Sequence, residues 1–227
     1  AIYSAYRELT TSNCDLAIAG GVDTGQSPFA YLCFSRSQAL SPTGRSMSFD
    51  QQADGIAISE GLGVVVMKRL HDALRDGDDI IAVIDGVGAA SDGRGSSLTS
   101  PQSTGQQLAV ERAWQSAGFP PSWMSLYEAH GTGTVAGDRT EIETVLAITQ
   151  RHAASPQSCA VSSTKPNIGH TKSSAGIAGL MHAALCIHHR VLSPQIGGST
   201  PLKQLQDPSS PIFLNRQASF WPTTVHG

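Results

Sequence analysis

His130 begins a histidine-glycine-threonine-glycine-threonine run that suits a binding loop better than a helix. Glycine lets a ligand approach the backbone closely, and the hydroxyl groups of Thr132 and Thr134 can both donate and accept hydrogen bonds. The plainer alternative is a tight turn whose histidine is satisfied by backbone carbonyls. The run predicts a binding loop that presents His130, Thr132 and Thr134.

A second histidine, His170, stands in a similar context, and the pair indicates a specific chemistry. Neutral imidazoles near helix N-termini resist protonation, because the positive end of the helix dipole disfavours a nearby cation. Two N–H donors that meet at one oxygen stabilise an enolate or oxyanion, worth about 3 to 4 kcal/mol per donor in other enzymes. Lys165 could raise the local potential or pair with a carboxylate such as Glu141, although a solvated surface lysine is the plainer alternative.

Both histidines are predicted to lie on loops that follow a strand and precede a helix. The strands are expected over 126–129 and 159–163, and the helices over 138–148 and 173–187. In open α/β sheets such loops gather at the carboxyl edge of the strands, where ligands bind. The second helix begins with small residues on all sides, which predicts a central buried helix.

The rest of the chain predicts further elements of an α/β fold. Helices are expected over 2–9 and 103–117, buried strands over 15–22, 62–70 and 80–87, and a closing strand over 212–220. Residues 25–55 carry serine-proline pairs and few apolar repeats, so this segment is expected to be mostly loop. The polar stretch 72–79 is the expected boundary between two subdomains.

Composition and charge exclude several classes of protein. With 40% hydrophobic and 15% charged residues among 227, the chain is neither disordered nor a coiled coil. A formal net charge of -3 gives no basic surface for nucleic-acid phosphates. No apolar run is long enough to span a bilayer. We therefore expect a cytoplasmic protein without a nucleic-acid or membrane partner.

The four cysteines lie far apart, which indicates reduced and mostly buried thiols rather than disulfides or a zinc site. Cys33 is the most tempting nucleophile, but no base stands near it in the sequence, so a core position is expected. His182 and Cys186 lie one helical turn apart on a predicted helix that also carries His188 and His189, but no acidic residue or second thiol completes a ligand set. No metal site is predicted.

Together these motifs resemble the ketosynthase (β-ketoacyl synthase) domain of type I polyketide and fatty-acid synthases. The segments that carry the resemblance are DLAIAGGVD over 15–23, the FD, ADG and SEG pieces of 49–61, EAHGTGT over 128–134 with Gly137, Asp138 and Glu141, and STKPNIGH over 163–170. The run that begins at His170 and the segment 21–35 look most similar to iterative synthases of enediyne or polyunsaturated chains.

The resemblance implies a partial thiolase-like α/β fold with layered α-β-α-β-α arrangement. Residues 1–76 would form the end of its N-terminal half, and 77–227 most of its C-terminal half. The implied reaction is a decarboxylating Claisen condensation of a cysteine-bound acyl chain with a malonyl unit. That unit arrives on the phosphopantetheine arm of an acyl carrier protein, and the domain itself binds no cofactor. A homodimer and other domains of the same synthase are the further partners implied.

The resemblance also assigns roles by position. His130 and His170 would promote decarboxylation and hold the enolate and thioester oxygens. Lys165 would support His170, and Thr132 and Thr134 would bind the pantetheine arm.

Two segments of the family have no counterpart in this sequence. These are the T-A-C-S-S-S type segment with the nucleophilic cysteine and the closing G-F-G-G-T-N type segment. We therefore expect a piece of a larger synthase that does not catalyse condensation alone. Two alternatives stay open: a non-catalytic partner that sets chain length, and a malonyl decarboxylase that needs only the histidines.

Overall fold

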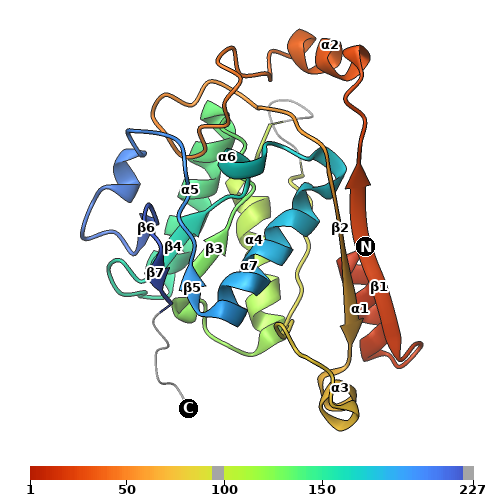
Figure 1. The fold of residues 1–227 in the computed structure, drawn as a ribbon. Coiled ribbons are helices and arrows are strands. Elements are labelled where there is room, and N and C mark those ends of the chain that lie inside the picture. Colours follow the sequence, from red (N-terminus) through yellow and green to blue (C-terminus); the bar gives the residue numbers. More distant parts are fainter. Residues whose placement is uncertain (94–99, 222–227) are drawn as a thin grey trace.

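Two sheets of different kinds frame the computed structural model, which describes residues 1–93 and 100–221 (Figure 1). The first is an antiparallel pair of β1 (Leu16–Asp23) and β2 (Gly61–Lys68). The second is parallel, with strand order β3-β4-β6: β3 (Leu126–Glu128), β4 (Cys159–Ser162) and β6 (Ile212–Leu214). A small antiparallel pair joins β5 (Val191–Leu192) and β7 (Ser219–Phe220). In the sequence, both strands of the first sheet precede residue 76 and all three strands of the second sheet follow it.

The helices connect and cover these sheets. In chain order they are α1 (Ile2–Thr10), α2 (Pro28–Arg36), α3 (Leu70–Asp76), α4 (Ser103–Ala117), α5 (Val135–Arg151), α6 (Lys165–Ile168) and α7 (Ala175–His189), with 3₁₀ turns η1 (Pro121–Trp123), η2 (Lys172–Ser174) and η3 (Lys203–Leu205). Within the described ranges, no helix combines the length and apolar character that crossing a bilayer requires.

The core lies between the parallel sheet and α5. All four residues of β4 are buried, as expected of the central strand of a parallel sheet. Ile142 and Val145 of α5 pack with Val161 of β4, and none of the three side chains is exposed. Phe49 also belongs to this core, so the long segment between α2 and β2 is anchored beside the parallel sheet.

Helix α7 lies between the two sheets and contacts β1, β2 and β3 (Figure 1). Glycines allow the close approach: a Cβ atom at Gly63 would lie 2.9 Å from Ile177, and one at Gly179 would lie 3.2 Å from Glu128. Part of α7 is nevertheless exposed, at Met181, Leu185 and Ile187. The prediction of a helix buried all round is therefore wrong for these residues, because the sheets cover only part of its circumference.

One face of the β1–β2 pair is also exposed. Alternate residues of both strands are large, apolar and exposed, namely Leu16, Ile18, Val22, Leu62, Val64 and Val66. The opposite face packs on α7 and η2. The prediction that these strands are buried on both faces is wrong, because within the described residues helices cover only one face.

Three further predictions of local structure are corrected. Helix α2 forms inside the segment expected to be loop: Pro28 starts the helix, and the Ser27 side chain accepts a hydrogen bond from Ala30 N at 3.3 Å. Residues 80–87 form no strand, since no described strand pairs with them; Gly88 instead lies against the backbone of α4. The strand expected over 212–220 divides into β6 and β7, which belong to different sheets.

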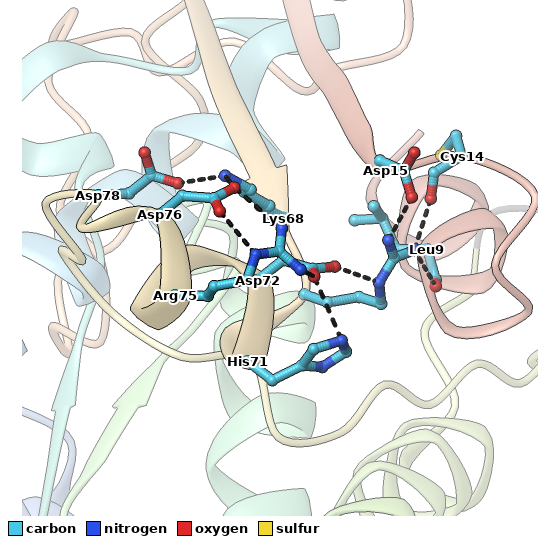
Figure 2. Close-up of polar contacts among 10 residues, drawn as sticks. Leu9, Cys14, Asp15, Lys68, His71, Asp72, Arg75, Asp76 and Asp78 are labelled. Carbon is cyan, nitrogen blue, oxygen red and sulfur yellow. Dashed lines mark hydrogen bonds and ion pairs between the residues drawn. The ribbon is translucent and has the colours of Figure 1, made fainter.

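A charged cluster ties α1, β2 and α3 together at the end of β2 (Figure 2). Arg69 donates hydrogen bonds to Cys14 O at 2.7 Å and to Asp72 at 2.6 Å, and it also pairs with Asp15. Lys68 pairs with Asp76 at 2.5 Å. These contacts fix the turn between α1 and β1 relative to α3.

Candidate active site

The structure brings His130 and His170 together. Their ring centroids lie 5.2 Å apart and their planes are nearly perpendicular, at 87°. His130 follows β3, and His170 lies between α6 and η2, after β4. Because β3 and β4 are adjacent parallel strands, the loops at their carboxyl ends meet at one edge of the sheet, as the strand-loop-helix pattern predicts.

The tautomer of neutral His170 is set by its surroundings. Its Nδ1 accepts a hydrogen bond from the backbone N–H of Lys172 at 3.0 Å. A ring nitrogen that accepts cannot carry the proton, so the hydrogen of the neutral ring lies on Nε2. The backbone of His170 is held by Ala57 O at 2.7 Å and by Ser59 N at 3.0 Å. His170 is therefore placed to donate through Nε2.

The backbone at His130 is held from both sides. The N–H groups of His130 and Gly131 donate to the two carboxylate oxygens of Glu141, each at 2.6 Å. The carbonyl oxygen of His130 accepts a hydrogen bond from Lys165 Nζ at 2.5 Å. The loop position is thus fixed by one carboxylate and one ammonium group, while the imidazole itself takes no part in this hold.

Lys165 is not the solvated surface residue that its type favours, since only 3% of it is exposed. Its ammonium group donates to the His130 carbonyl rather than forming an ion pair with Glu141, which was one sequence-based expectation. Burial lowers the pKa of Lys165, while the nearby Glu141, Glu128 and Asp138 act in the opposite direction. Lys165 thus places a positive charge beside the His130 loop, where it acts on both imidazoles.

Both imidazoles are neutral near pH 7. Desolvation and then the charge of Lys165 lower the pKa of His130 and of His170 to about 4. The charge of Lys165 acts on an imidazole whether or not the ring is buried. Because His130 is exposed and His170 only half-buried, this charge supports the lowered pKa of both residues. The neutral state was predicted from helix dipoles, but neither residue lies in the first turn of a helix.

Thr132 and Thr134 lie in the same loop as His130, and this loop is shaped by glycine. Their Oγ1 atoms are 2.9 Å apart; Thr132 is buried and Thr134 half-buried. Gly133 has a φ of 77°, in the left-handed region that favours glycine. Its N–H donates to Asp138 at 3.1 Å.

Asp138 is a structural member of the site to which the sequence analysis assigned no role. It also accepts a hydrogen bond from the Phe49 N–H at 2.6 Å, and so it joins the segment between α2 and β2 to the loop of His130. Burial raises the pKa of Asp138 to about 6 against these hydrogen bonds, and burial likewise raises the pKa of Glu141 to about 7. The available signal was spacing: both acids lie one turn apart at the start of α5, facing the loop.

No hydrogen bond or ring contact in the described part of the chain joins a cysteine to either histidine. Cys159 is fully buried in β4, and desolvation raises the pKa of its thiol to about 12. Cys33 is exposed on α2, so the prediction of a core position is wrong; a proline-started helix carries it on the surface. Neither thiol is placed as a nucleophile for the histidine pair.

His182 belongs to a separate chain of hydrogen bonds. Its Nδ1 lies 2.8 Å from Glu128 Oε2, and its Nε2 lies 2.5 Å from Ser193 Oγ, beside a cavity of about 160 Å³. Two backbone N–H groups that line this cavity are already engaged: Ser163 N with Gln195, and Thr164 N with Glu128. We therefore infer that these hydrogen bonds of His182 fix α7 against β3. Within the described residues, no group of three or more histidine, cysteine or acidic side chains gathers as a metal site.

Family comparisons cover nearly the whole chain. Residues 1–73 match the family described as Beta-ketoacyl synthase, N-terminal domain. Residues 81–199 match the family described as Beta-ketoacyl synthase, C-terminal domain. The histidine pair and Lys165 lie within the second match.

Curated relatives are long polyketide synthases. The chain is 39% identical over 224 residues to the Spectinabilin polyketide synthase system protein NorA' of Streptomyces orinoci, covering 99% of this chain and 6% of that protein. It is 35% identical over 219 residues to the polyketide synthase PksL of Bacillus subtilis, covering 96% of this chain and 5% of that protein. The chain thus spans a small share of these relatives.

Solved structures show the same architecture. The ketosynthase from module 6 of the bacillaene synthase of Bacillus subtilis 168 superposes with a TM-score of 0.94 at 34% identity. The match covers 98% of this chain and 40% of that one. The Streptomyces albus oxazolomycin ketosynthase domain gives a TM-score of 0.93 at 32% identity, and the match covers 99% of this chain and 40% of that one.

Proposed function

The chain belongs to the β-ketoacyl synthase family, and we propose that it supplies the histidine pair for a decarboxylating Claisen condensation. Its fold is part of the thiolase-like α/β fold of the ketosynthases to which it is similar. The single observation that carries the proposal is the pair of neutral imidazoles with ring centroids 5.2 Å apart.

The proposed reaction begins with loss of carbon dioxide from a malonyl thioester. The bond from the α-carbon to the carboxylate breaks, and its electron pair passes to the thioester carbonyl as an enolate. Nε2–H of His170 donates to that enolate oxygen. His130 donates to the carbonyl oxygen of the acyl thioester that the enolate attacks. The enolate carbon then attacks an acyl thioester, and the cysteine thiolate leaves.

Neutral rings suit this step better than charged rings. An imidazolium would form an ion pair with the malonyl carboxylate and so stabilise the ground state as well as the transition state. A neutral N–H donor gains strength only as charge develops on the oxygen. Desolvation and the Lys165 charge together hold both pKa values low, so Lys165 favours the chemistry although its ammonium group bonds only to the His130 carbonyl.

Substrate delivery and partners are part of the same proposal. An acyl carrier protein would bring the malonyl unit on its phosphopantetheine arm, and Thr134 and Thr132 would bind the amides of that arm. The acyl-carrying thiol is proposed to lie outside these 227 residues, which is supported by the absence of thiol contacts at the described histidine pair. We further propose a homodimer that works in the cytoplasm beside other domains of its synthase.

The test uses the complete protein that carries this chain, with malonyl carrier protein labelled at the free carboxylate. We expect His170→Ala to slow carbon dioxide release about 10² to 10³-fold, the usual effect of removing one oxyanion donor. Acylation of the cysteine stays within about twofold of the wild type, because it does not need the enolate donor. His188→Ala, at an exposed position of α7, is the matched control and should release carbon dioxide normally.

The outcomes separate the alternatives. Release of carbon dioxide without a β-ketoacyl product would identify a malonyl decarboxylase. Absence of both in the wild type would identify a non-catalytic partner. Unchanged release in His170→Ala would contradict the role given to the histidine.

A further inference from the structure

Lys172 links the active-site loop to the antiparallel sheet. Its backbone N–H is the donor to His170 Nδ1, at 3.0 Å. Its side-chain Nζ lies 3.0 Å from Asp23 Oδ1 and donates to Ser59 O at 2.8 Å. One residue therefore contacts the ring through its main chain and, through its side chain, both the end of β1 and the segment that leads into β2.

The backbone of Lys172 needs such support. Its φ is 48°, in the left-handed region that residues other than glycine adopt rarely. Conformations of this kind persist only where the surrounding structure holds them. The direction of the N–H toward His170 depends on this φ value, so whatever holds the residue also aims the hydrogen bond.

The contact with Asp23 has the properties of a fixed ion pair. Each side chain is only 15% exposed, and Asp23 Oδ2 also accepts a hydrogen bond from Ser173 Oγ at 2.9 Å. The hydrogen bond from Lys172 is the largest cause that lowers the pKa of Asp23 to about 2, so the carboxylate is charged across the neutral range. Asp23 ends β1, and its carboxylate thus anchors η2 on both Lys172 and Ser173.

We propose that the Asp23–Lys172 ion pair positions His170 by holding the Lys172 backbone in the conformation that donates to Nδ1. The proposal rests on the function proposed above for His170. Asp23 and Lys172 are positioning residues, since their side chains bond to each other, to Ser59 and to Ser173 rather than to either imidazole. The consequence is that the antiparallel sheet sets the tautomer and direction of a ring that follows the parallel sheet.

The kinetic test compares Asp23→Asn and Lys172→Met with the wild type in the complete protein. Small misplacements of a catalytic group cost rate rather than substrate affinity. We expect kcat for carbon dioxide release to fall about tenfold, with KM within about twofold. Lys172→Arg keeps the charge and reach toward Asp23, and we expect it to retain most of the activity.

Asp76→Asn is the matched control. It removes one of the two ion pairs that Lys68 forms at the other end of β2, away from the histidines, and the pair with Asp78 remains. We expect wild-type kcat there, with a Tm similar to that of Asp23→Asn. A fall in kcat as large as that of Asp23→Asn would show a general effect of weakening the sheet and would overturn the proposal.

A second measurement needs no substrate and separates this inference from the proposed function. Carbethoxylation of the two histidines is followed by peptide mass spectrometry. When the Lys172 N–H no longer covers Nδ1, we expect His170 to react several-fold faster in Asp23→Asn and Lys172→Met, while His130 keeps its rate. An unchanged ratio of the two rates would refute the positioning role, even if the wild type proves to be a ketosynthase. A changed ratio in a protein that releases no carbon dioxide would retain the positioning role and reject the function.

Discussion

The buried ammonium group of Lys165 influences both imidazoles although it forms no hydrogen bond to either ring. It donates to the His130 carbonyl and lies close enough to both imidazoles that its charge lowers both pKa values. A histidine with a lowered pKa needs a more acidic solution before it takes a proton. The lysine therefore adds to desolvation in keeping the two donors neutral over the pH range in which a cell operates.

Replacing Lys165 by Met removes that charge and leaves desolvation as the main cause of the shift. The imidazolium forms are then less disfavoured, so both pKa values rise from about 4 toward 6.5. We expect the acidic limb of the pH profile for carbon dioxide release to move to higher pH by about one unit. Lys203→Met, at an exposed position, provides the comparison and leaves the limb in place. A limb that stays in place in Lys165→Met as well would mean that Lys165 does not set these pKa values.

The two histidines could be found from the sequence because glycine and threonine surround one of them and both follow short apolar strands. The contacts that aim them could not be found. The Lys172 N–H that sets the tautomer is a main-chain group, and Asp23 is distant in the chain and adjacent only after the sheets pack. Side-chain type predicts which groups do chemistry, whereas main-chain donors become visible only with the fold.

At the scale of elements, the sequence predicted best where the chain is covered. α5 and β4 form close to where apolar spacing places them, because their pattern reflects burial against the core. The prediction was wrong for residues 80–87, whose apolar run has no described strand to pair with. A strand is defined by its partner, and composition alone carries no information about that partner.

Gly88 is expected to be one of the least replaceable residues outside the site. A Cβ atom there would lie 2.2 Å from Ala109 O, which belongs to the backbone of α4 and cannot rotate away. We expect Gly88→Ala to destabilise the protein by about 1 to 3 kcal/mol, as overpacking against rigid neighbours does. Chemical denaturation measures the change.

Gly176→Ala serves as the reference for this substitution. Nothing lies within 4 Å of a Cβ atom at Gly176, and alanine is the better helix former in α7. The free energy of unfolding there should rise by about 0.5 to 1 kcal/mol or stay unchanged. Equal losses at both positions would show that the packing of residues 86–88 on α4 carries no special weight.

At the scale of the whole molecule, the exposed face of the β1–β2 pair is the largest departure from an ordinary protein surface. Its large apolar side chains form two adjacent rows of alternate residues. Monomeric proteins rarely expose such a continuous apolar patch. The 227-residue chain by itself therefore presents an apolar sheet face to solvent.

We expect that isolated chain to bind the dye ANS and to self-associate at micromolar concentration. Ile18→Lys combined with Val66→Glu places an opposite-charge pair across the exposed face, since these residues are partners in the ladder. This double variant should bind less dye and sediment as a smaller species. Thr140→Lys, at a half-buried polar position on α5, is the comparison. Equal dye binding by all three proteins would mean that another surface causes the association.

The hydrogen bonds that fix His130 involve only main-chain atoms of its loop, and this has an evolutionary consequence. Glu141 binds two peptide N–H groups and Lys165 binds a peptide carbonyl, so nearly every residue type offers the same groups at this position. A mutation can therefore replace the side chain at position 130 while the loop keeps its structure. Such a scaffold allows a lineage to change or lose its chemistry in one codon, and to regain it as easily, while the surrounding architecture persists.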